Sequence, residues 1–291
     1  MNDINVTDPY LAGSKSYAAY MNAPYKSIKH STYFPVYDQI FSRFIGKPMT
    51  FIEIGVLDGG SLFMWREFFG PKARIIGVDL NPTAKKWEKD GFEIYIGSQE
   101  DKSFLEYVFK AAGEIDIILD DGGHTFEQQV NTCEVALDYV KDDGLIFVED
   151  THTSYMPKYG GPSKYSFISY VSNIINGINY RYSEFVDKSH DKAIYSVSIY
   201  ESIVVFNINR ALCGLKSHPT SNNGISSDEI DYCLTDAKGW SLLEYLRIKL
   251  KFIKKYPLIG AFSEKLYYKF KVVLLMWPRI SRLKKYFKYE N

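Results

Sequence analysis

Between residues 49 and 148 the chain alternates short apolar runs with longer amphipathic stretches. The runs span residues 50–56, 74–80, 92–96, 115–119 and 145–148, and the amphipathic stretches span 62–69, 102–112 and 126–140. Short buried runs separated by helical stretches are typical of parallel strands joined by crossover helices. This alternation predicts an α/β fold with a doubly wound, mostly parallel sheet.

Two further apolar runs, 193–199 and 202–208, are joined tightly at residues 200–201. So short a connection is typical of antiparallel strands, and we expect a C-terminal hairpin at the edge of the sheet. A polar segment rich in Gly, Pro and Asn follows. The predicted organisation is an N-terminal segment or lid at 1–48, a catalytic domain at 49–215, a linker at 216–238 and a helical tail at 239–291.

The tail is basic and the rest of the chain is acidic. Residues 241–291 hold thirteen basic and three acidic residues, a net charge of +10, which leaves −10 on residues 1–240. Apolar residues recur there at spacings of three and four, at Ile259, Phe262, Leu266, Phe270, Val273 and Trp277. A basic amphipathic helix with aromatic residues suits an anionic membrane surface. The alternative is a helical subdomain packed on the acidic body or on a partner subunit; we expect no nucleic acid.

The composition excludes several classes of protein. A hydrophobic fraction of 46% and a charged fraction of 24% are those of a globular chain, not a disordered one. The longest apolar run, 272–277, is far shorter than the roughly 20 residues of a membrane span, and we expect no secretory signal at the N-terminus. Cys133, Cys213 and Cys233 lack metal-ligand spacing, which favours reduced thiols in a cytoplasmic protein, peripheral to the inner face of the membrane if the tail binds there.

A glycine-rich turn follows the first predicted strand. Gly55, Gly59 and Gly60 lie in it, Glu53 precedes it, and Asp79 ends the second predicted strand. Glycines let the backbone approach a ligand, and an acid at the end of the second strand can bind ribose hydroxyls. The pattern indicates a nucleoside-containing cofactor. The alternative is a turn that requires glycine only for its backbone conformation.

Acidic residues follow two other predicted strands. Asp120, Asp121 and His124 come after the strand at 115–119, and Glu149 and Asp150 come after the strand at 145–148. The carboxyl ends of neighbouring parallel strands meet at one edge of a sheet, where these carboxylates would repel one another without a cation. Mg²⁺ prefers oxygen ligands, and a histidine can accept a proton near neutral pH. We therefore predict a magnesium site; helix capping and solvent exposure are the alternatives.

Other residues nearby have several interpretations. His152 could support the site, contact the substrate or be an ordinary loop histidine. His30 and Asp38 could belong to a lid over the site. Four tyrosines fit loop packing better than a platform for a sugar ring, at positions Tyr155, Tyr159, Tyr165 and Tyr170.

Five short segments together resemble a known family. They are FIEIGVLDGGSL, GVDLNP, IGSQED, ILDDGGHTFEQQ and VEDTHTSY, in this order between residues 51 and 155. They resemble the class I S-adenosylmethionine-dependent methyltransferases, in the metal-dependent branch that includes macrolide sugar O-methyltransferases of the mycinamicin type and cephalosporin hydroxylase-like proteins. The resemblance extends over about residues 30–208 and implies a Rossmann-like sheet that ends in an antiparallel hairpin.

The resemblance also implies roles for individual residues. Those expected to bind S-adenosylmethionine are Glu53, Gly55, Gly59, Ser61, Asp79, Ser98, Gln99 and Asp120. Asp121, Glu149 and Asp150 would hold Mg²⁺, and His124 would be the base. The family pattern at 97–101 reads G-D-Q-E-D, whereas this chain has Ser98, and a hydroxyl in place of that carboxylate implies a weaker contact with adenine.

The implied activity is methyl transfer from S-adenosylmethionine to a sugar hydroxyl, in surface polysaccharide or other glycan biosynthesis. A sugar hydroxyl is a poor nucleophile at neutral pH, so Mg²⁺ would make it more acidic and His124 would remove its proton. The implied partners are a sugar or glycan acceptor and further copies of the chain in a homo-oligomer. The alternatives are a non-catalytic membrane or assembly adaptor on the same fold and a nicotinamide-dependent oxidoreductase, against which the lack of G-x-G-x-x-G speaks.

Overall fold

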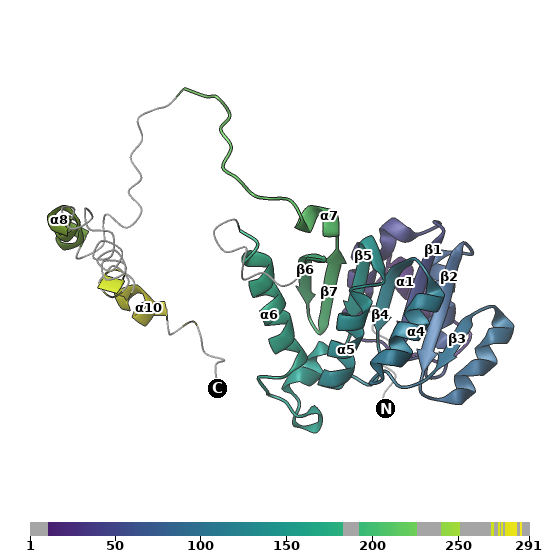
Figure 1. Ribbon diagram of the computed structural model, residues 1–291. Helices are drawn as coiled ribbons and strands as arrows, with labels where there is room; N and C mark the ends of the chain where they lie inside the picture. The colour runs from purple at the N-terminus through teal and green to yellow at the C-terminus, as the bar shows by residue number, and fades with distance from the viewer. Residues whose placement is uncertain are drawn as a thin grey trace. The chain divides into compact units, whose positions relative to one another are not determined.

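The computed structural model describes residues 11–182, 192–225, 240–250 and 277–283, together with residues 269, 270, 273, 275 and 286. The chain divides into two compact units, Met1–Pro219 and Thr220–Asn291 (Figure 1). The boundary between them lies inside the segment 216–238 that the sequence predicts as a linker. The first unit carries all the residues predicted for the site.

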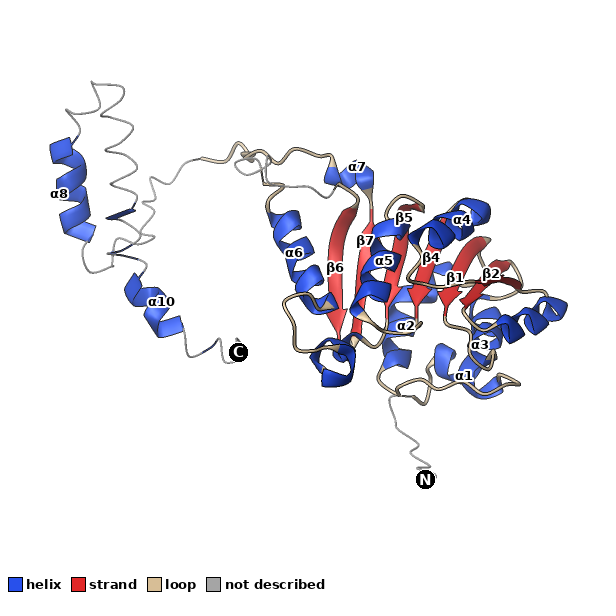
Figure 2. Cartoon of the chain, turned by 60° about the horizontal axis from the view of Figure 1, so that its bottom comes forward, coloured by secondary structure: helices blue, strands red, loops and turns tan. Residues whose placement is uncertain are grey.

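The first unit is built on a seven-stranded sheet with the strand order β3-β2-β1-β4-β5-β7-β6 (Figure 2). The strands are β1 (Met49–Ile54), β2 (Ala73–Asp79), β3 (Glu93–Ile96), β4 (Ile115–Asp120), β5 (Val140–Val148), β6 (Ile194–Tyr200) and β7 (Ile203–Ile208). The pairs among β1 to β5 are parallel, and β7 pairs antiparallel with both β5 and β6. The doubly wound α/β sheet with a C-terminal hairpin is confirmed.

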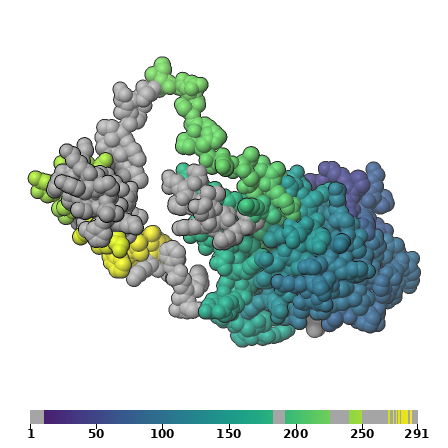
Figure 3. All heavy atoms as spheres, viewed as in Figure 1, coloured from purple at the N-terminus to yellow at the C-terminus, as the bar shows by residue number. Residues whose placement is uncertain are grey.

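Helices cover both faces of this sheet (Figure 2). The α-helices of the first unit are α1 (Lys15–Asn22), α2 (Tyr33–Phe41), α3 (Gly60–Phe69), α4 (Lys102–Ala112), α5 (Phe126–Ala136), α6 (Phe167–Asn179) and α7 (Arg210–Cys213). Short 3₁₀ helices are η1 (Ser42–Phe44), η2 (Pro82–Asp90), η3 (Thr151–Tyr155) and η4 (Pro157–Tyr159). Drawn as spheres, these elements form a closely packed body (Figure 3).

Two hydrophobic clusters lie on opposite faces of the sheet, because neighbouring strand residues point to opposite sides. Phe51 belongs to the cluster that includes side chains of α1, α2 and α3. Its neighbour Ile52 belongs to the cluster that includes side chains of α4, α5 and α6. The strands β1, β2 and β4 are buried on both faces and are therefore continuous apolar runs, which is why the sequence indicated them so clearly.

The predicted end of one helix and the predicted start of the next strand are wrong. The helix expected over 126–140 ends at Ala136, and β5 begins at Val140 rather than at residue 145. The first residues of β5 include Lys141, Asp142 and Asp143, which no apolar pattern marks as strand. Pairing of Val140 with Ile115 of β4, across an irregularity in the register, extends the strand there.

The second unit contains α8 (Trp240–Leu250) and α10 (Trp277–Leu283). Most of the remaining tail, including residues 251–268, lies outside the described residues, so the amphipathic helices predicted there stay a prediction. No helix in the described part of the chain combines the length and the apolar character needed to cross a membrane.

Candidate active site

The predicted site residues gather at the carboxyl ends of β1, β2, β3, β4 and β5, around a cavity of about 500 Å³. The cavity wall comes from the turns after these strands and from the segment before α2. Its lining includes Lys26, Ser27, Ile28, Gly55, Ser61, Asp79, Ser98, Gln99, Asp121, His124, Gln128 and Asp150. Ligands of open α/β sheets bind at this edge.

The turn after β1 depends on two glycines. Gly55 has φ +95°, and a Cβ atom there would lie 2.1 Å from the carbonyl oxygen of Asp121, so the turns after β1 and β4 touch through backbone. Gly59 has φ +85°, and a Cβ atom there would lie 2.3 Å from the Trp87 ring. Gly55 lines the cavity, whereas Gly59 lies outside its lining and allows the packing of Trp87.

Glu53 lies beneath the cavity rather than in its lining. It is fully buried, and its carboxylate accepts hydrogen bonds from Ser61 Oγ at 2.8 Å and Trp65 Nε1 at 3.0 Å. Burial and the nearby Asp121 raise the pKa of Glu53 to about 7, against the opposing effect of Lys29 and the two hydrogen bonds. Glu53 therefore positions Ser61, whose side chain belongs to the cavity lining.

Asp79 ends β2 and lines the cavity. Its Oδ2 accepts hydrogen bonds from the backbone of Val56 at 2.8 Å and Leu57 at 3.0 Å, and its Oδ1 accepts one from Asn81 at 2.7 Å. The carboxylate is thus fixed against the glycine-rich turn. This is the place where an acid can contact ribose hydroxyls.

Gln99 and Asp120 form a buried network next to Ser98. Gln99 Nε2 donates to Asp120 Oδ2 at 2.7 Å and to Thr132 Oγ1 at 2.9 Å, and Gln99 Oε1 accepts from Gly123 N at 3.2 Å. Asp120 is fully buried, which raises its pKa, and it lies outside the cavity lining. Asp120 therefore acts on the cavity through Gln99 and the loop that carries His124.

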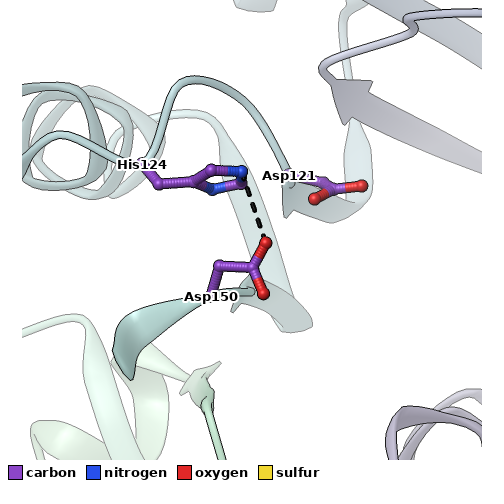
Figure 4. Close-up of side chains that lie close together, drawn as sticks. All are labelled: Asp121, His124 and Asp150. Carbon is purple, nitrogen blue, oxygen red and sulfur yellow. Dashed lines mark ion pairs between the residues drawn. The ribbon is translucent and has the colours of Figure 1, made fainter. Parts of the chain in front are cut away.

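Asp121, His124 and Asp150 form a cluster (Figure 4), and all three line the cavity. Each offers one ligand atom, and these atoms lie within 4.8 Å of one another. His124 Nε2 is 3.3 Å from Asp150 Oδ2, and His124 Nδ1 is buried with no hydrogen-bond partner among the described residues. The backbones of His124 and Asp150 are left-handed, with φ of 59° and 54°, a conformation that is rare outside glycine and recurs at functional sites.

Glu149 is not brought into this cluster. It is fully buried, and its carboxylate accepts from Tyr37 Oη at 2.6 Å and from Lys29 Nζ at 2.9 Å. Burial raises the pKa of Glu149, and the negative charge of Asp121 raises it further. Burial likewise raises the pKa of Tyr37, to which the neighbouring Glu149 carboxylate adds. Of the three carboxylates predicted as metal ligands, the structure gathers Asp121 and Asp150 and pairs Glu149 with an internal ammonium group.

Lys29 is a site residue that the sequence did not reveal. Its Nζ lies 2.6 Å from Asp121 Oδ2 and 2.9 Å from Glu149 Oε2, and only 1% of its side chain is exposed. Burial disfavours the charge, but Asp121, Glu149 and Glu53 offset this and hold the pKa of Lys29 well above its usual value. A lysine 92 residues before Asp121 in an irregular segment gives no pattern from which this pair could be predicted.

Tyr33 was also missed, although a signal existed for it. Tyr33 and Tyr37 are four residues apart, which places both on one face of α2. Tyr33 Oη donates to Asp150 Oδ1 and lies 2.9 Å from Ser202 Oγ, and burial beside Asp150 raises the pKa of this hydroxyl. Tyr33 thus fixes the orientation of the Asp150 carboxylate.

The remaining candidates fall into three groups. His152 Nδ1 contacts Ser202 Oγ and lies 3.9 Å from Asp150 Oδ1, and the His152 ring centroid lies 5.9 Å from that of His30. Asp38 instead accepts hydrogen bonds from the first backbone amides of α1. The tyrosines at 155 and 165 are largely exposed, and Tyr170 donates to Glu134.

Comparison with known proteins adds a family and a set of relatives. Residues 52–151 match the model of a methyltransferase domain family. An 8-demethyl-8-(2-methoxy-alpha-L-rhamnosyl)-tetracenomycin-C 3'-O-methyltransferase of Streptomyces olivaceus is 36% identical over 134 residues, which are 44% of this chain and 34% of the relative. The mycinamicin VI 2''-O-methyltransferase of Micromonospora griseorubida is also 36% identical, over 137 residues, 44% of this chain and 33% of the relative. The chain thus spans about a third of the length of these relatives.

A solved structure agrees with the fold. The MycE methyltransferase of the mycinamycin biosynthetic pathway, in complex with Mg, SAH and mycinamycin VI, superposes with a TM-score of 0.59 at 25% identity. The match covers 71% of this chain and 55% of that one. The Rossmann-like architecture expected from the motifs is therefore confirmed.

Proposed function

We propose that this chain, which belongs to the class I methyltransferases through the domain at residues 52–151, transfers a methyl group from S-adenosylmethionine to a sugar hydroxyl in a Mg²⁺-dependent reaction. One observation carries the proposal: Asp121, His124 and Asp150 line the same cavity as Asp79 and Gly55 of the glycine-rich turn. Curated relatives named as sugar O-methyltransferases support the acceptor class.

The residues of the cavity fit the cofactor. Asp79 is placed for the ribose, and Gly55 brings the backbone to the cavity wall without a side chain. Ser61 lies in the first turn of α3, where the amide groups of a helix N-terminus favour the carboxylate of the methionine part of the cofactor. A volume of about 500 Å³ is that of a site for one small molecule.

The cluster fits a hard divalent cation. Asp121 and Asp150 provide two carboxylates from adjacent turns. The third member of the cluster is His124, whose Nδ1 has no hydrogen-bond partner among the described residues. Oxygen ligands from one or two carboxylates, with positions left for the substrate, are what Mg²⁺ uses. We propose that Asp121 and Asp150 hold the ion, with Glu149 supporting the site through Lys29 and Tyr37.

The proposed reaction divides the work among these residues. Bound Mg²⁺ supplies Lewis-acid polarisation of the acceptor hydroxyl, and S-adenosylmethionine supplies the methyl group. His124 accepts the proton from that hydroxyl, because its ring lines the cavity next to Asp150. Tyr33 fixes the orientation of Asp150, and Lys29 donates a hydrogen bond to Asp121. Positioning of the acceptor hydroxyl against the methyl donor provides the rest of the rate acceleration.

The proposal is tested by titration calorimetry and turnover on the full chain. The wild type is titrated with S-adenosylmethionine, with NAD as a control, in Mg²⁺ and in a chelator. We expect saturable binding of S-adenosylmethionine but not of NAD, and survival of that binding in the chelator. Asp121→Asn and Asp150→Asn should lose Mn²⁺ binding, measured by electron paramagnetic resonance, and turnover of sugar acceptors while keeping the cofactor. Exposed Asp90→Asn is the matched control.

His124→Gln separates a base from a ligand. If His124 is the base, turnover falls about 100-fold or more while Mn²⁺ affinity stays the same. A loss of Mn²⁺ affinity in this variant would make His124 a ligand. Unchanged turnover and Mn²⁺ binding in both aspartate variants, or binding of NAD in place of S-adenosylmethionine, would refute the proposed function.

We propose two further properties of the whole protein. The acceptor belongs to a surface polysaccharide or another glycan, and residues 239–291 bring the enzyme to an anionic membrane surface; the charge of +10 on residues 241–291 supports this. We also propose that the chain forms a homo-oligomer, which the resemblance of its motifs to this family implies. Light scattering of the purified chain measures the oligomeric state directly.

A further inference from the structure

Residues 23–30, which we call the N-terminal strap, connect α1 to α2 across the cavity. Lys26, Ser27 and Ile28 of the strap line the cavity. A Cβ atom at Gly60 would lie 2.3 Å from the carbonyl oxygen of Tyr25, so the strap backbone rests directly on the start of α3. The Tyr25 ring lies 4.3 Å from that of Trp87, centroid to centroid, which anchors this end of the strap.

The other end of the strap is anchored by Lys29. Its ammonium group forms two ion pairs, with Asp121 after β4 and with Glu149 after β5. The side chain is almost fully buried, so water screens these pairs little. The strap is thus held at Tyr25 by aromatic contact and at Lys29 by charge.

Asp121 belongs to two arrangements at once. Its Oδ2 accepts from Lys29 at 2.6 Å, and the same residue is a member of the cluster with His124 and Asp150. An ammonium group and a divalent cation on one carboxylate repel each other, and in a buried site that repulsion is strong. Each of them therefore weakens the hold of the other on Asp121.

We propose that Lys29 competes with the divalent cation for the Asp121 carboxylate, so that cation binding loosens the N-terminal strap over the cofactor cavity. The inference rests on the proposed function in taking the Asp121 cluster as the cation site. Coupling between two sites is reciprocal. Removing the charge of Lys29 must therefore tighten cation binding, and adding the cation must weaken the attachment of the strap.

The first measurement is Mn²⁺ affinity by electron paramagnetic resonance on the full chain. Lys29→Gln and Lys29→Met remove the charge, and Lys26→Gln removes an exposed charge from the same strap and the same cavity wall. We expect both Lys29 variants to bind Mn²⁺ about tenfold more tightly than the wild type, within the range of measured couplings between sites. Lys26→Gln should stay within about twofold.

The second measurement is tryptic cleavage of the wild type after Lys26, followed by mass spectrometry with and without Mg²⁺. Cleavage after Lys216, in the exposed segment that follows α7, is the internal reference for any effect of Mg²⁺ on trypsin. We expect Mg²⁺ to accelerate cleavage after Lys26 severalfold relative to the reference. In Lys29→Gln the cleavage should be fast without Mg²⁺ and unchanged by it.

Several outcomes would overturn the inference. Equal or weaker Mn²⁺ binding in the Lys29 variants would show that Lys29 orients Asp121 for the ion instead of competing with it. Slower or unchanged cleavage after Lys26 in Mg²⁺ would show that the strap is not released, and this wild-type result decides even if the variants fail to fold. Absence of Mn²⁺ binding in every protein, wild type included, would refute the proposed metal site itself.

Discussion

At the scale of single residues, Glu53 is a titratable group with no contact to the cavity it supports. It is buried under α3 with hydrogen bonds from Ser61 and Trp65. Its pKa in the folded protein is raised from an ordinary value of 4.5 to about 7. At a pH between these two values, Glu53 is therefore protonated in the folded protein and ionised in the unfolded chain.

This difference predicts a pH dependence of stability. Because the folded state binds the extra proton, the contribution of Glu53 to the free energy of unfolding falls as the pH rises from about 4.5 to about 7 and then levels off. The two pKa values correspond to a loss of about 3 kcal/mol. Glu53→Gln cannot titrate, so its free energy of unfolding, measured in urea at several pH values, should lack this fall.

The exposed Glu106→Gln on α4 is the matched control and should follow the wild type at every pH. Parallel curves for the wild type and Glu53→Gln across the same range would contradict the raised pKa.

The site residues that the sequence identified share a position at strand ends. Asp121, His124 and Asp150 were predicted there and lie together, because the carboxyl ends of parallel strands meet at one edge. Lys29 and Tyr33 were not predicted, because their contacts join residues 92 and 117 positions apart through the packing of the strap and α2. Glu149 lies outside the cluster because its carboxylate accepts hydrogen bonds from Tyr37 of α2 and from Lys29.

At the scale of elements, α5 fixes the loop that carries His124. Thr125 is the N-cap of α5: its side chain accepts from Gln128 N, and the Gln128 side chain accepts from Thr125 N. The N-cap residue Thr125 directly follows His124, and α5 begins at Phe126. The start of α5 therefore holds the left-handed backbone of His124 in place.

Thr125→Ala should lower the free energy of unfolding by about 1 kcal/mol, because the part-buried amide of Gln128 in the first turn loses its partner. Thr32→Ala is the matched control, since Thr32 precedes α2 and its side chain makes no capping hydrogen bond within the described residues. We expect a change near zero for Thr32→Ala in the same urea titration. Equal effects of the two substitutions would show that the capping box is not what stabilises α5.

Element boundaries separate what pattern predicts from what packing decides. The cores of β1, β2 and β4 were predicted because strands buried on both faces are continuous apolar runs. The start of β5 was not, because Lys141–Asp143 lie in the irregular stretch between the pairs Ile115–Val140 and Ile117–Leu145. The local sequence indicates which residues are buried, whereas the pairing of a strand depends on which other strand lies next to it.

At the scale of the whole molecule, the chain is an acidic unit followed by a basic one. The first unit ends at Pro219, and its sheet, both hydrophobic clusters and the cavity are composed almost entirely of its own residues. A unit with its own core can fold alone. The second unit includes α8, on which Leu242, Tyr245 and Ile248 are at least half exposed.

A fragment of residues 1–219 should therefore unfold at the temperature of the full chain and bind S-adenosylmethionine with the same affinity. It should not sediment with anionic phospholipid vesicles, whereas the full chain should sediment at low salt and be released at high salt. Neutral vesicles are the control. Sedimentation of both proteins, or of neither, would contradict the proposed role of the tail, and an unfolded fragment would contradict the independence of the first unit.

The sequence by itself determined the strand order along the chain, the sheet type and the group of carboxylates at its edge. It could do so because burial on two faces and the polarity of parallel strands leave local patterns. Only the tertiary structure decided which carboxylates gather and which are neutralised. Asp121 and Asp150 converge with His124, while Glu149 pairs with Lys29. That choice depends on where the N-terminal strap lies across the sheet, and contacts between distant segments leave no periodic signal in the chain.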